Sequence, residues 1–89
     1  MNVKKLEKKL QKMVKADFPY AETFCDIVEY TRTYLCREAN TTITVNYGTV
    51  KGDKVLNSYV VHLFYTGRKS LSFILGMFYQ ASIEAETDE

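Results

Sequence analysis

The stretch TTITVNYGTVKGDKVLNSYVVHLFY, residues 41–65, decides the fold. From Ile43 to Tyr47 apolar and polar side chains alternate, which is the period of a half-buried strand. The KGDK segment at 51–54 has the composition of a turn, and the residues after it are again rich in β-branched and aromatic side chains. The sequence therefore predicts an antiparallel hairpin of two strands, 41–50 and 55–65.

The segment 3–14, near the start of the chain, has the pattern of an amphipathic helix. Its apolar residues are spaced three and four apart, and lysines occupy the opposite arc. Asn2 is a suitable N-cap. The apolar residues form a narrow seam, which could pack on one neighbouring helix of this chain or of a second copy. The seam consists of Val3, Leu6, Leu10 and Met13.

A second helix is predicted over 19–39. Pro19 interrupts the first helix and is well placed to start another. Apolar residues at helical spacing follow, and Asn40 is a suitable left-handed stop. The apolar face would consist of Tyr20, Phe24, Ile27, Val28, Thr31, Leu35 and Ala39.

The segment 70–86 is almost continuously apolar, which fits either a buried helix or a central strand. Its length and its Glu-Ala-Glu ending favour the helix. The alternative is a third strand, which would give a meander with two helices on one face. Either arrangement is α+β. We expect one domain over 1–89, with 84–89 as an acidic tail, because the chain is too short for two cores.

No combination of residues in the sequence predicts catalysis or metal binding. The single histidine, His62, lies in a predicted strand, and Cys25 and Cys36 are too far apart on the predicted helix to act together. We therefore expect neither enzymatic activity nor a cofactor. The sequence shows no secretory signal and no membrane span, so we expect a cytoplasmic protein.

Two groups of cations are candidates for binding an anion or a nucleic acid. Residues 1–15 hold six lysines against Glu7, and the lysines form one arc of the first helix. In the segment 66–70 a strand, a glycine turn and two cations precede a helix start, which together are typical of an anion site. The candidate residues are Lys5, Lys8, Lys9, Lys12, Arg68 and Lys69.

Tyrosines favour a protein partner. On the predicted second helix Tyr30 and Tyr34 would lie one turn apart beside Arg37, and Tyr and Arg are the side chains that anchor interfaces. The first hypothesis is therefore a small protein-binding or inhibitory domain that occludes a larger protein. We expect it to form a homodimer through the first-helix seam or through residues 70–83. The alternative is a nucleic-acid-binding domain that uses the lysine-rich first helix.

Overall fold

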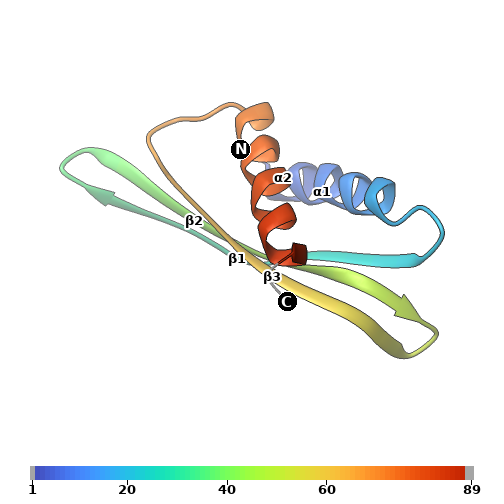
Figure 1. Ribbon diagram of the computed structural model, residues 1–89. Helices are drawn as coiled ribbons and strands as arrows, with labels where there is room; N and C mark the ends of the chain where they lie inside the picture. Colours follow the sequence, from blue (N-terminus) through green and yellow to red (C-terminus); the bar gives the residue numbers. More distant parts are fainter. Residues whose placement is uncertain (1, 88–89) are drawn as a thin grey trace.

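The computed structural model describes residues 2–87. The elements are α1 (Val3–Asp17), β1 (Glu22–Leu35), β2 (Glu38–Lys51), β3 (Lys54–Thr66) and α2 (Leu71–Thr87). The strands form one antiparallel sheet in the order β1-β2-β3, and both helices lie on the same face of it (Figure 1). The predicted α+β class, the first helix and the hairpin are confirmed.

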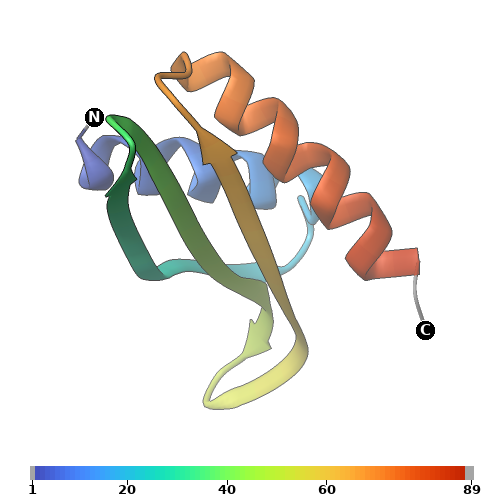
Figure 2. The same cartoon turned by 90° about the vertical axis from the view of Figure 1, so that its left-hand side faces the viewer.

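The hydrophobic core lies between the central strand and the two helices. Ile43 and Val45 of β2 are completely buried, as are Leu6 of α1 and Ile74 of α2. In Figure 2, α2 runs beside β3 and α1 crosses the sheet, where it contacts β1. One layer of helices over one layer of sheet therefore forms the core, and no described helix or strand covers the opposite face of the sheet.

Helix α1 begins as predicted. The Asn2 side chain accepts hydrogen bonds from the backbone N–H groups of Lys4 (3.0 Å) and Lys5 (3.3 Å), so it caps the helix. The apolar seam of the helix is packed on the sheet, and Leu6 and Leu10 are fully buried. This part of the seam is therefore filled within the chain and offers no surface to a second copy.

The helix predicted over 19–39 is wrong, because this segment contains β1. A register shift between Ile27 and Glu29 inserts one extra residue, Val28, into the strand. The extra residue breaks the alternation of inward and outward side chains, so the apolar spacing imitates that of a helix. Asn40, the predicted helix stop, lies inside β2 and pairs with Thr33.

The hairpin turn between β1 and β2 consists of Cys36 and Arg37. Both have positive φ, 52° and 69°, and Leu35 pairs with Glu38 on either side. Two-residue turns of this kind usually contain Asn or Gly, which tolerate positive φ. Because neither residue type is present at the turn, the sequence did not reveal this hairpin.

An acidic side chain of α1 supports the irregular part of β1. The carboxylate of Glu7 accepts a hydrogen bond of 2.8 Å from the backbone N–H of Ile27, next to the register shift. This hydrogen bond ties the backbone of β1 beside the bulge to α1. As a result, Glu7 is turned toward the sheet, whereas the neighbouring Lys8 and Lys9 are exposed.

The segment 70–86 forms a helix, as favoured, and not a third strand of this sheet. The Ser70 hydroxyl accepts a hydrogen bond from the N–H of Phe73 (3.2 Å) and so caps α2. The helix continues to Thr87 and therefore includes the first part of the expected acidic tail. Asp88 and Glu89, the last residues of that tail, lie outside the described residues.

The uncovered face of the sheet carries a polar connection across all three strands. The Thr44 hydroxyl donates to the carboxylate of Glu29 (2.9 Å) and lies 3.1 Å from Nδ1 of His62. The Thr44 hydroxyl has a single hydrogen, which it donates to the carboxylate of Glu29. In its contact with His62 the Thr44 oxygen is therefore the acceptor, and Nδ1 of His62 is the donor. Beside this connection Val60 and Phe64 are 53% and 59% exposed.

Candidate anion-binding site

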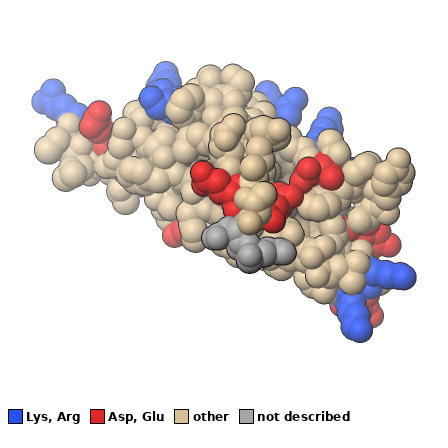
Figure 3. Space-filling model, viewed as in Figure 1, with Lys and Arg blue, Asp and Glu red and all other residues tan. Residues whose placement is uncertain are grey.

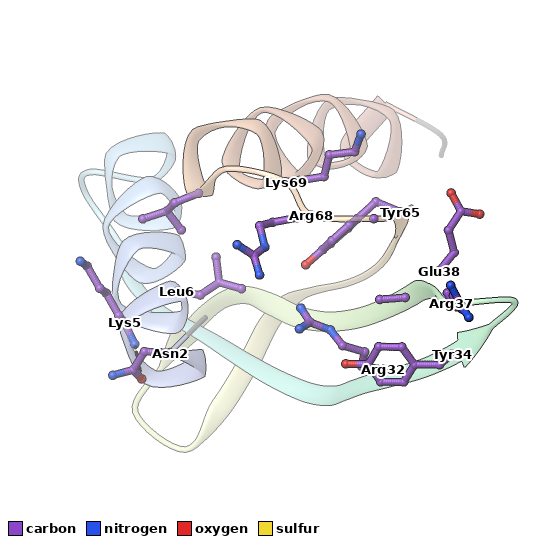
Figure 4. A pocket seen from close by; sticks show the side chains of 13 residues that line it. Asn2, Lys5, Leu6, Arg32, Tyr34, Arg37, Glu38, Tyr65, Arg68 and Lys69 are labelled. Carbon is purple, nitrogen blue, oxygen red and sulfur yellow. Dashed lines mark hydrogen bonds between the residues drawn. The ribbon is translucent and has the colours of Figure 1, made fainter.

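A hollow of about 770 Å³ lies where the start of α1, the β1–β2 hairpin and the segment between β3 and α2 meet. Five cationic side chains line it, against the single carboxylate of Glu38. They come from parts of the chain that are far apart in the sequence and meet only in the fold (Figure 4). The five cations are Lys5, Arg32, Arg37, Arg68 and Lys69.

Two arginines and a tyrosine point into the hollow. Figure 4 shows the guanidinium groups of Arg32 and Arg68 directed inward from opposite sides, with the hydroxyl of Tyr65 between them. Lys5 and Lys69 lie at the rim, and their side chains extend away from the centre. Two guanidinium groups and a hydroxyl are all hydrogen-bond donors, so the hollow suits an oxyanion.

Arg32 is held in place by hydroxyl groups. Its Nε donates to Oγ1 of Thr41 (3.2 Å) and its Nη2 donates to the hydroxyl of Tyr30 (3.1 Å). These contacts position the guanidinium without neutralising it. A guanidinium has five N–H groups, so two hydrogen bonds leave further donors for a ligand.

The hydroxyl of Tyr30 beside Arg32 stays protonated at neutral pH. Burial, followed by the neighbouring Tyr65, raises the pKa of Tyr30 above its ordinary value. Tyr30 is also the main cause that raises the pKa of Arg32, and hydrogen bonds with Tyr65 and Tyr34 add to it. The positive charge of Arg32 and the neutral hydroxyl of Tyr30 are therefore both maintained across the physiological pH range.

The lysines of α1 extend the cationic surface beyond the hollow. Lys5 lines both the hollow and a shallow depression along the outer side of α1. Glu7, the only acidic residue among the first fifteen, is bonded to the backbone of β1. In Figure 3, Lys and Arg side chains lie around the margin, whereas Asp and Glu gather near the C-terminal end of α2. The lysines along the depression are Lys4, Lys5, Lys8, Lys9 and Lys12.

The fold brings together most of the residues that the sequence suggested for two separate sites. Arg68, Lys69 and Lys5 line the same hollow as Tyr34 and Arg37, which were predicted to bind a protein. Lys8, Lys9 and Lys12 lie further along α1. Tyr30 does not form an outward patch with Tyr34 and Arg37, since it is half-buried and bonded to Arg32.

Sequence reasoning missed Arg32, which points into the centre of the hollow. In a strand, residues 30, 32 and 34 lie on one face, so two tyrosines flank this arginine. The predicted helix placed Arg32 away from both. The signal was present in the alternating pattern Tyr-Thr-Arg-Thr-Tyr, which is typical of a strand.

Residues 2–87 contain no group of three or more His, Cys, Asp or Glu side chains that could hold a metal ion. Cys25 is buried, and burial followed by the charges of Asp26 and Glu7 raises its pKa to about 12. A thiol in that setting is not nucleophilic. His62 is bonded to Thr44 on the uncovered face of the sheet.

Neither helix in the described part of the chain is long and apolar enough to cross a membrane. Comparisons with protein-family models, with curated proteins and with solved structures gave no match to this chain.

Proposed function

We propose that the protein binds nucleic acid through the phosphate backbone, without reading the base sequence. The observation that supports this most is the hollow itself, which is lined by five cations from three parts of the chain, two of them arginines that point inward. Arginine contacts phosphate with paired N–H groups, and lysine contacts it as a point charge. Such contacts supply most of the affinity of sequence-independent binding.

The length of the cationic surface favours a polymer over a small anion. Lys5 connects the hollow to the depression along α1, which continues as far as Lys12. At a rise of about 1.5 Å per residue, Lys5 and Lys12 lie roughly 10 Å apart along the helix axis. A single phosphate would occupy only the hollow, whereas a nucleic acid would contact the lysines as well.

The side chains on this surface favour a duplex over a single strand. Proteins that hold single strands stack the bases on exposed aromatic rings. Among the residues that line the hollow, Tyr34 is 71% exposed but Tyr65 is buried. One exposed ring does not make a stacking platform, so we expect contacts with the backbone of a double helix.

Binding of a labelled duplex, followed by fluorescence anisotropy over a series of salt concentrations, tests the proposal. The slope of log affinity against log salt is negative, and each lost phosphate contact makes it less steep by about 0.9. The variant Arg32→Gln with Arg68→Gln should therefore flatten the slope by roughly two. The control, Lys51→Gln with Lys54→Gln, removes the same charge at the β2–β3 turn. Equal slopes for the two variants would exclude the hollow as the binding site.

A protein-binding or inhibitory role is the second candidate. It is favoured by the uncovered face of the sheet, where Val60 and Phe64 lie exposed on either side of His62. Exposed apolar side chains grouped on one face are typical of interaction surfaces. The two candidates differ in their response to salt, because an apolar interface does not weaken as salt rises. Capture of one host protein that resists high salt and is lost in Phe64→Ser would favour this second role.

A further inference from the structure

The outward face of α2 is apolar at its centre, although no other element within residues 2–87 covers it. Ser72, Gly76, Tyr79 and Ile83 follow one another at spacings of four, three and four, so they form one stripe along the helix. Tyr79 is 55% exposed and Ile83 is 42% exposed. The buried side chains Ile74, Phe78 and Ser82 lie on the opposite side and pack on the sheet. The stripe therefore plays no part in the core.

Gly76 lies in the middle of this stripe, and no close contact among residues 2–87 requires a glycine there. A Cβ atom added at Gly76 would meet no other atom within 4 Å. Glycine inside a helix lowers its stability relative to alanine, and no packing contact of the described residues offsets this cost at Gly76. A glycine on an exposed helix face permits the close approach of another backbone.

We propose that the occupant of this face is α2 of a second copy, which crosses antiparallel at Gly76 and forms a two-fold symmetric dimer. In such a dimer the two-fold axis passes beside Gly76. A residue a given number of positions before Gly76 in one copy therefore faces the residue the same number of positions after Gly76 in the other copy. Phe73 and Tyr79 are both three positions from Gly76, so the two rings meet across the axis. Ser72 and Gln80 are both four positions away and can form a hydrogen bond.

The charges on α2 complement one another only in the antiparallel arrangement. Lys69 lies just before the N-terminal end of the helix, and Glu84 lies near the C-terminal end. Figure 3 shows acidic side chains gathered near this C-terminal end. Lys69 is seven positions before Gly76 and Glu84 is eight positions after it, so in an antiparallel pair Lys69 of each copy lies within one position of Glu84 of the other, and the helix dipoles are also opposed. A parallel pair would place like charges together.

The proposed dimer shares Lys69 with the hollow, whereas the lysines of α1 lie on another element, so the dimer is tested without nucleic acid. Its test is sedimentation equilibrium of the full chain at micromolar concentrations without nucleic acid. Phe73→Ser should weaken dimerisation about ten-fold or more. The matched control is Phe64→Ser, which removes the same ring at a similar exposure from the uncovered face of the sheet. The control should leave the dimer unchanged.

A charge exchange tests the orientation. Lys69→Glu and Glu84→Lys should each weaken the dimer, and the double variant should restore it, because both symmetric pairs are then re-formed. Circular dichroism of each variant shows that the fold is kept. A monomeric wild type at high micromolar concentration would overturn the proposal. So would a dimer lost in Phe64→Ser but not in Phe73→Ser, or a double charge variant no better than the single ones.

Discussion

Substitutions at the turn between β1 and β2 test two properties separately, the stability of the fold and the binding of a duplex. Cys36 and Arg37 both adopt positive φ, 52° and 69°. For residues other than glycine this conformation costs about 1–2 kcal/mol. Replacement by glycine removes that cost, but it also increases the entropy of the unfolded chain by about 0.4–1 kcal/mol. We therefore expect Cys36→Gly and Arg37→Gly each to raise the free energy of unfolding by about 0.5–1 kcal/mol.

Thermal unfolding followed by circular dichroism measures this gain. For a domain of this size the expected increase in Tm is about 2–8 °C for each variant. Arg37 lines the hollow, so Arg37→Gly should also weaken duplex binding and flatten its salt dependence by about one unit. Cys36→Gly leaves the charge unchanged and should bind as the wild type does.

A third variant, Arg37→Lys, keeps both the charge and a side chain that is strained at positive φ. It should therefore match the wild type in Tm and retain most of the binding. A lower Tm in both glycine variants would refute the idea that the turn stores conformational strain. Equal binding by Arg37→Gly and the wild type would remove Arg37 from the site.

Three further predictions concern the core and its edges. Gly48→Ala should lower stability by about 1–3 kcal/mol or prevent folding, because its Cβ would overlap the carbonyl oxygen of Asn57; urea unfolding measures the loss. In native protein a thiol reagent should modify Cys36 quickly and the buried Cys25 only after denaturation, so equal rates for the two thiols would contradict the buried position of Cys25. Burial raises the pKa of Glu86 in the folded state above its ordinary value of 4.5. The folded state therefore favours the protonated Glu86, which stabilises the fold at acidic pH. This stabilisation is lost as the pH rises from the ordinary pKa through the raised one. The advantage of Glu86→Gln over the wild type should therefore grow from pH 4 to pH 7, and a constant difference would show that Glu86 does not titrate in this way.

The sequence predicted those elements whose residues follow one period over most of their length. β2 and β3 pair without a break from Asn40 to Thr49, with a register shift only between Thr49 and Val50, and the seam of α1 keeps helical spacing over its full length. In both cases the local pattern agrees with the tertiary packing, because the apolar residues of each pattern enter the core. Such agreement makes a prediction from one sequence reliable.

The prediction for the segment that contains β1 was wrong for two physical reasons. Its extra residue, Val28, interrupts the alternation, and Cys36 and Arg37 form a tight turn without the residues that usually mark one. The same error prevented the sequence from predicting which residues of the candidate site lie together. Arg68, Lys69 and Lys5 could be selected from their charge, but their proximity to Arg32 depends on β1 being a strand that returns beside β2. A contact of this kind arises from topology and is not visible in local spacing.

The most direct test of nucleic-acid binding is the salt dependence of the affinity of the wild-type protein for a duplex of arbitrary sequence. Isothermal titration or anisotropy at several salt concentrations gives the slope of log affinity against log salt. We predict a steep negative slope that Lys5→Gln, Lys8→Gln, Lys9→Gln and Lys12→Gln together flatten by about three to four units. Absence of duplex binding at low salt, or an affinity that does not change with salt, would contradict the proposal.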